Sequence, residues 1–161
     1  MQTAERAEKL AIYAGAYQEL VDALAGFPRE MWQFRPAPDD WTIHEIIIHI
    51  TDSEANSYVR ARRLLAEPGL ALMAYDEMSW SVQLDYLRLN PVTALECFRW
   101  LRQSTYELIH DQPEAVWSQT AYHPESGDIT LDDWLDIYAR HVRDHIAQMD
   151  RVYESWLEAG S

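Results

Sequence analysis

Four long amphipathic segments constrain the fold of this chain more than any other feature of its sequence. In the first, apolar residues between Leu10 and Leu24 recur at the i, i+3, i+4 and i+7 positions that line one face of a helix. The same spacing appears in three further segments, which run from 42 to 65, from 90 to about 111 and from 130 to 156. Four such helices, each of about 20–28 residues, favour an all-α four-helix bundle.

Helix start signals agree with three of these boundaries. Thr42 and Glu45 have the spacing of a capping box, in which each side chain bonds the other residue's backbone N–H. Asn90 precedes a proline that would occupy the first helical position of the third segment. Thr130, with Asp133 three residues later, starts the fourth. We therefore expect the helices to begin directly after Thr42, Asn90 and Thr130.

The connections between these segments are long. Residues 26–41 and 112–129 exceed the 2–8 residues that are usual between bundle helices, and long loops are often functional. Residues 66–90 form a crossover between the two helix pairs, with room for a short helix after Asp76. We expect a single domain over residues 1–161.

The two long loops share a pattern. Pro28-x-x-x-Trp32 precedes the second helix, and Pro113-x-x-x-Trp117 precedes the fourth. Either the chain contains a weak internal repeat of two helix pairs, or two proline-broken loops coincide by chance.

Composition excludes several functional classes. The chain has 13 Lys and Arg against 27 Asp and Glu, and its net charge of −14 disfavours binding to nucleic acid and to anionic membranes. No segment has the length and apolarity of a membrane span, and the first residues lack the pattern of a signal peptide. The single cysteine, Cys97, excludes an internal disulfide, so we expect a cytoplasmic protein.

The strongest chemical signal is His141-x-x-x-His145 in the fourth segment. Residues four apart lie one turn apart on the same side of a helix, which is the spacing two imidazoles need to bind one metal ion. His49, on the flank of the apolar face of the second helix, is a candidate third ligand. Three imidazoles would leave a position open for water or substrate. The alternative is a set of core histidines satisfied by carbonyls or carboxylates.

Glu54 also lies on the second helix, in line with its apolar stripe. A carboxylate placed there must be paired, ligate a metal or line a wet cavity, unless the end of the helix frays and exposes it.

The sequence resembles the DinB superfamily, most closely its YfiT-like branch. The resemblance extends from about residue 28 to residue 157 and is carried by the segments WTIHEIIIHITDSEANSYVRARRLL, YDEMSW, YHPESG and YARHVRDHIAQM. It implies a four-helix bundle with a divalent metal, zinc or nickel, held by His49, His141 and His145, and frequently a homodimer. Some YfiT-like proteins have a histidine where this chain has Glu54. This departure suggests the hypothesis that Glu54 acts as a catalytic general base.

The same resemblance implies two activities, a metal-dependent hydrolase and a transferase that uses a low-molecular-weight thiol cofactor. We therefore expect a metal-dependent enzyme acting on a small molecule; the alternative is a non-catalytic stress-response module that binds a metal or small ligand. Arg140 and Arg143 flank the histidines, where they could bind a cofactor's carboxylates or form surface ion pairs. Residues of the long connections are candidates for the mouth of the pocket, namely Tyr75, Asp76, Trp80 and His123.

Overall fold

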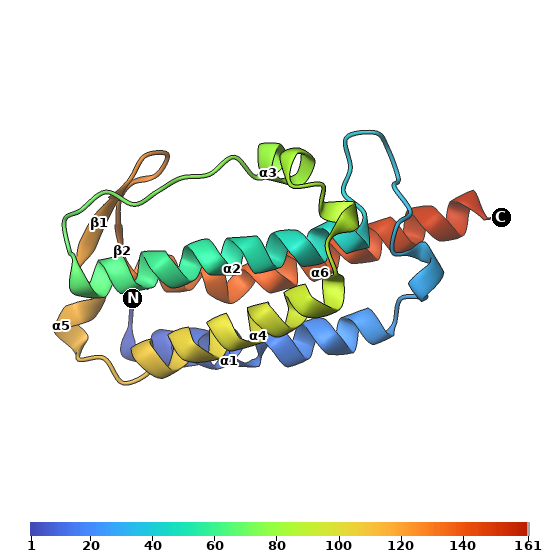
Figure 1. Cartoon of the computed structure of the whole chain (residues 1–161). Helices are drawn as coiled ribbons and strands as arrows, with labels where there is room; N and C mark the ends of the chain where they lie inside the picture. Colours follow the sequence, from blue (N-terminus) through green and yellow to red (C-terminus); the bar gives the residue numbers. More distant parts are fainter. Residues whose placement is uncertain (161) are drawn as a thin grey trace.

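The computed structural model describes residues 1–160 and contains the expected four-helix bundle. Its long helices are α1 (Thr3–Ala25), α2 (Ile43–Ala66), α4 (Pro91–Ile109) and α6 (Leu131–Ala159). Helix α1 packs mainly against α6, and α2 packs against both α4 and α6 (Figure 1). Within residues 1–160, no helix is long and apolar enough to cross a membrane.

The helices begin where the sequence predicts. The Thr42 hydroxyl accepts a hydrogen bond from the backbone N–H of Glu45, and the Glu45 carboxylate accepts from Thr42 in return. Thr130 and Asp133 form the second capping box, at the start of α6. Asn90 caps α4 through its side-chain oxygen. These local bonds satisfy the first backbone donors of helices whose later turns are held by packing.

The two long loops contain the same local structure, which supports the internal repeat. A short helix follows each proline: η1 (Arg29–Met31) after Pro28 and α5 (Glu114–Trp117) after Pro113. Each tryptophan indole then donates a hydrogen bond to a carbonyl five residues earlier, Trp32 to Phe27 at 3.3 Å and Trp117 to Gln112 at 3.2 Å. In each loop, a buried indole is therefore hydrogen-bonded to the residue just before the proline, and a capped helix follows.

The crossover contains the short helix expected after Asp76. Helix α3 (Glu77–Gln83) begins with the Asp76 carboxylate accepting from the backbone N–H of Ser79, and a 3-10 turn, η2 (Tyr86–Arg88), follows. In Figure 1 the crossover runs along α2 from one end of the bundle to the other.

The second long loop contains a β-hairpin that the sequence analysis does not predict. Strands β1 (Thr120–His123) and β2 (Gly127–Thr130) pair antiparallel, and Ala71 of the crossover forms a parallel bridge with Tyr122. The turn ends at Gly127, whose φ of 75° favours glycine. Four-residue strands with one face buried are too short to give a clear alternation in the sequence.

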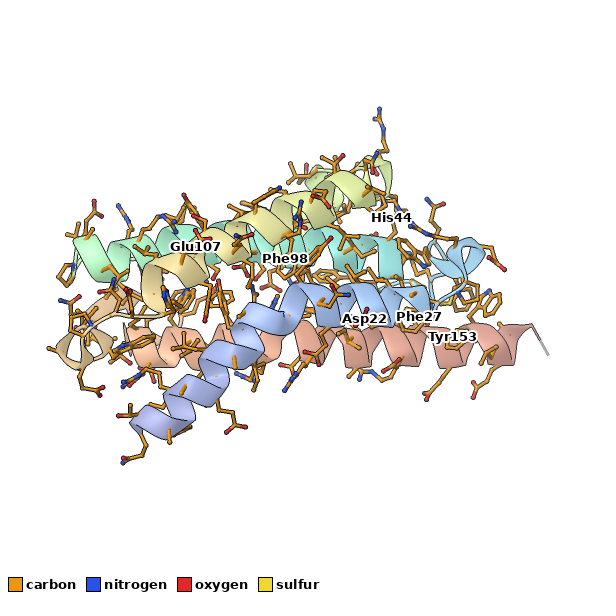
Figure 2. All side chains as sticks on the ribbon, turned by 90° about the horizontal axis from the view of Figure 1, so that it is seen from below. Asp22, Phe27, His44, Phe98, Glu107 and Tyr153 are labelled. Carbon is orange, nitrogen blue, oxygen red and sulfur yellow. The ribbon has the colours of Figure 1, made fainter. Side chains whose placement is uncertain are left out.

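Two apolar clusters fill the bundle, one at each end. At the end that contains η1, the Phe27 ring meets Tyr153 of α6 with a centroid separation of 5.6 Å, and Phe98 of α4 is fully buried (Figure 2). At the hairpin end, Trp134 and Leu135 of α6 pack with Trp117 of α5. His49 of α2 and His141 and His145 of α6 adjoin the first cluster. Buried polar side chains, among them Ser53, Glu54 and Arg102, separate it from the second cluster.

A nearly buried arginine joins α1 to the start of α6. The Arg6 guanidinium donates to Asp132 at 2.7 Å and to Glu114 at 2.6 Å. Burial alone would raise the pKa of Asp132, but hydrogen bonds led by the one from Arg6 outweigh it and hold the pKa below its ordinary value. The Arg6 hydrogen bond also lowers the pKa of Glu114.

Acid should therefore weaken the folded state through this contact. The stabilisation is fully present above the ordinary aspartate pKa near 3.9 and is lost as the pH falls through the lowered value. We expect the urea midpoint of the wild-type chain to fall more steeply below about pH 4 than that of Arg6→Met. Equal slopes for the two proteins would contradict this account.

Candidate metal centre

Three histidines from two helices converge in the middle of the bundle. His49 of α2 faces His141 and His145 of α6, and one ligand atom from each lies within 4.8 Å of the others. The Nε2 atoms of His141 and His145 are 3.3 Å apart, and the ring of His49 lies 5.5 Å and 4.7 Å from their rings, centroid to centroid. His49 is buried, whereas His141 and His145 are partly buried. The structure thus brings together the three residues proposed as ligands.

The imidazoles are held neutral. Burial, together with the neighbouring His145, lowers the pKa of His49 to about 3. Burial and the two other histidines lower the pKa of His141 well below its ordinary value, and burial lowers that of His145. A neutral imidazole keeps a lone pair for a metal ion, whereas a protonated one cannot ligate.

A side chain next to the cluster determines which nitrogen of His145 keeps its lone pair. Gln148, one turn beyond His145, places its amide oxygen 2.8 Å from Nδ1 of His145. Because an amide oxygen only accepts, Nδ1 carries the proton and the unprotonated Nε2 faces His141. Nδ1 of His49 is buried and has no hydrogen-bond partner within residues 1–160. These features fit a divalent metal better than histidines satisfied by carbonyls or carboxylates.

Replacing Gln148 with leucine should therefore weaken metal binding. Without the amide oxygen the His145 ring loses its preferred tautomer and orientation, and loss of such a partner typically costs about 10–100-fold in affinity. Competition with a chromophoric chelator measures the Zn²⁺ affinity. Gln18→Leu, on the exposed side of α1, serves as the control; an equal affinity in both variants would rule out the orienting role.

The structure pairs Glu54 with an arginine instead of placing it in a wet cavity. Its carboxylate accepts from Arg102 Nη2 at 2.5 Å and from the Tyr13 hydroxyl at 2.6 Å. Both Glu54 and Arg102 are at most 2 % exposed. The fraying alternative is therefore wrong, and pairing is the alternative that holds. With both oxygens engaged, the geometry favours a structural role, and the general-base hypothesis stays a prediction.

The two arginines proposed for a cofactor form surface ion pairs. Arg143 donates to Glu19 of α1 at 2.9 Å, and Arg140 lies 3.7 Å from Asp144. Both guanidinium groups are at least half exposed. Of the two roles predicted for Arg140 and Arg143, binding a cofactor's carboxylates or forming surface ion pairs, the structure shows the surface ion pairs.

The proposed mouth residues lie on the crossover and the hairpin. The rings of Tyr75 and Trp80 are in contact, with centroids 4.6 Å apart, and the Tyr75 hydroxyl is buried without a hydrogen-bond partner in the described part of the chain. His123 is buried in β1, and its Nδ1 accepts from the backbone N–H of Glu125. Burial and Arg60 lower the pKa of His123.

Several neighbours of the histidines were not predicted from the sequence. The Ser53 hydroxyl lies 3.3 Å from Nε2 of His141, one turn beyond His49 on α2. The Trp41 ring contacts His49 with centroids 4.5 Å apart and also lines a cavity of about 360 Å³ beside α3. Ser53 could have been found from its i, i+4 spacing to His49; Trp41, in a loop, gives no such signal.

Comparison with known proteins agrees with this fold. The DinB superfamily model matches residues 12–149. "Putative metal-dependent hydrolase YfiT" of Bacillus subtilis is 31% identical over 113 residues, which are 70% of this chain and 64% of that protein. A "Putative metal-dependent hydrolase" of Oceanobacillus iheyensis is 31% identical over 109 residues, 68% of this chain and 63% of that protein. The match thus spans slightly less than two thirds of each curated relative.

A solved structure extends the comparison over nearly the whole chain. It is described as "YfiT from Bacillus subtilis is a probable metal-dependent hydrolase with an unusual four-helix bundle topology". It covers 94% of this chain, and this chain covers 87% of it, with a TM-score of 0.87 at 24% identity. At that identity the likeness shows the fold. Taken with the match over residues 12–149, it leads to one conclusion: this chain belongs to the DinB superfamily.

Proposed function

We propose that this chain is a metal-dependent hydrolase of a small molecule, with His49, His141 and His145 as the metal ligands. The observation that carries the proposal is the convergence of three neutral, largely buried imidazoles. The names of the Bacillus and Oceanobacillus relatives support the same activity. Zinc and nickel are the proposed ions because both bind imidazole well.

A bound divalent ion supplies a Lewis acid that polarises a substrate carbonyl and promotes deprotonation of a nucleophile. The chain's own residues supply position and exclusion of water. Gln148 orients His145, and the Trp41 ring covers one side of His49. The Ser53 hydroxyl beside His141 is available to hydrogen-bond a substrate oxygen.

A thiol-dependent transferase is less well supported by the geometry. The arginines that would bind a thiol cofactor's carboxylates, Arg140 and Arg143, are engaged with Asp144 and Glu19.

Turnover assays on the metal-loaded chain test the proposal. We expect the zinc- or nickel-loaded protein to hydrolyse members of a panel of small esters, amides and lactones, and to lose that activity on chelation and in His145→Ala. The same panel of electrophiles with added low-molecular-weight thiols detects a transferase. Thiol-dependent turnover without hydrolysis would replace the hydrolase by a transferase. A fully loaded protein that turns over none of these substrates would favour a non-catalytic binding module.

A further inference from the structure

Three hydroxyl groups lie close together beside His141. The Ser53 hydroxyl of α2 is 3.3 Å from Nε2 of His141. Tyr138, on the preceding turn of α6, has its ring centroid 6.0 Å from that of the imidazole. The third group is the phenol of Tyr75 in the crossover. Burial raises the pKa of both phenols, and Ser53 lies close enough to each phenol to lower its pKa in part.

Tyr75 is the member of this group whose buried hydroxyl has no hydrogen-bond partner in the described part of the chain. Ser53 contacts His141, and the Tyr138 hydroxyl accepts from Arg60 Nη1 at 2.9 Å. Buried polar groups are nearly always hydrogen-bonded, so an unpaired phenol beside a candidate site points to a bound molecule as its partner. The Tyr75 phenol is protonated at neutral pH, because burial raises a pKa that is ordinarily near 10. Tyr75 can therefore donate a hydrogen bond.

Other contacts hold this phenol in place. Its ring contacts Trp80, with centroids 4.6 Å apart. Two residues before Tyr75, the Met73 carbonyl accepts two hydrogen bonds from Arg60, at 2.8 Å and 3.3 Å, and one residue after it Asp76 caps α3. A donor that is fixed before the substrate binds needs no reorganisation when negative charge develops on a substrate oxygen.

The charges around Tyr75 disfavour an anionic substrate. Asp76 and Glu77 follow Tyr75 in the chain, and the Glu77 carboxylate lies 3.9 Å from Nε2 of His49. Arg60 is a positive charge that acts on Tyr75, but it is already engaged by the hydrogen bonds given above. Phosphate and carboxylate groups are recognised chiefly by arginine and lysine, whereas a neutral hydroxyl suits a carbonyl oxygen. The surroundings of Tyr75 thus suit an uncharged acyl compound.

We propose that Tyr75 is a catalytic residue which, together with Ser53, hydrogen-bonds the reacting oxygen of an uncharged acyl substrate. The inference rests on the proposed function, because it requires hydrolysis at the histidine cluster. In the hydrolysis of an ester, the oxygen of water forms a bond to the acyl carbon, and the π electrons of the carbonyl move onto its oxygen. Tyr75 and Ser53 donate to the negative charge on that oxygen. When the carbonyl re-forms, the bond to the leaving oxygen breaks; the attacking water has lost one proton, the leaving oxygen gains one, and Tyr75 keeps its own.

Trifluoroacetone tests the binding role without turnover, because it is uncharged and its hydrated carbonyl resembles the tetrahedral state of the reaction. Fluorine NMR titration of the Zn²⁺-loaded chain measures its dissociation constant. We expect Tyr75→Phe to weaken this binding by about 10-fold or more, since one hydrogen bond is lost. The Zn²⁺ affinity, measured by competition with a chelator, should stay unchanged. Tyr122→Phe removes the same hydroxyl from a half-exposed ring of β1 and should change neither quantity.

Ester turnover supplies a second measurement. With p-nitrophenyl acetate, Tyr75→Phe should lower kcat by about 100-fold or more and change KM little, which is the loss expected for one donor to a developing negative charge. The wild type should hydrolyse p-nitrophenyl phosphate, which has the same leaving group but a charged acid group, far more slowly than the acetate.

The outcomes separate this inference from the proposed function. If Tyr75→Phe binds the ketone as tightly as Tyr122→Phe, Tyr75 does not donate to the substrate, while ester hydrolysis by the wild type still supports the proposed function. If the wild type binds the ketone more tightly than Tyr75→Phe but hydrolyses no ester, the donor role of Tyr75 is supported and the hydrolase is wrong. A Zn²⁺ affinity that falls in Tyr75→Phe would give Tyr75 a structural role instead. Faster turnover of the phosphate ester would overturn the substrate class.

Discussion

Replacing Arg102 with alanine should lower the free energy of unfolding by about 3–5 kcal/mol, since removal of one partner leaves a buried charge uncompensated. The Arg102 guanidinium is 2 % exposed, pairs with Glu54 and donates to the carbonyls of Tyr13 and Tyr138. It also stacks on the Tyr13 ring at 3.9 Å. One side chain of α4 thus contacts α1, α2 and α6. Urea unfolding followed by circular dichroism measures the loss.

Two further variants make the comparison specific. Arg99→Ala removes a partly buried arginine of the same helix, whose ion pair with Glu96 lies at the surface, and should change stability by about 1 kcal/mol or less. The double variant Arg102→Met with Glu54→Gln removes both charges, and we expect it to be more stable than Arg102→Ala. A single Arg102→Ala variant as stable as Arg99→Ala would contradict the account. Glu54→Gln assayed for turnover tests the general-base hypothesis separately, and full activity would remove it.

The second large effect concerns the histidine cluster. A saturating metal stabilises the chain because it binds only the folded site strongly, and at 100 times its dissociation constant the gain is about 2.7 kcal/mol. We expect Zn²⁺ to raise the unfolding free energy of the wild type by about this amount and to have almost no effect on His141→Ala. The affinity of this variant should fall by more than the roughly 100-fold that loss of an orienting residue can cost.

An exposed histidine supplies the control. His110 lies at the end of α4, where Nδ1 is within 3.2 Å of the carbonyls of Tyr106 and Glu107. His110→Ala should cost a little stability but keep the full gain from Zn²⁺, because the ring lies outside the cluster. A gain retained in His141→Ala would show that the ion binds elsewhere.

Local signals explain what the sequence could predict. The starts of α2, α4 and α6 follow from capping residues that act within three positions of Thr42, Asn90 and Thr130. The pairing of His141 with His145 follows from one helical turn. These features depend on residues that are close in the chain, so the local sequence pattern predicts them.

Distant contacts explain what the sequence could not predict. Arg102 lies 48 residues from Glu54, and nothing in the pattern of α4 shows that this arginine points inward. Trp41 contacts His49 from the loop before α2, and its position depends on how that loop folds. The β-hairpin likewise depends on Ala71 beside Tyr122.

The order of the elements along the chain also has a kinetic consequence. Helix α1 packs chiefly against α6, the last helix, and His49 meets its partners only after about 90 more residues have been synthesised. At translation rates of about 5–20 residues per second, His49 waits on the order of 5–20 s for the histidines of α6. We expect slower folding than in a bundle of sequential hairpins, because first and last helices must find each other.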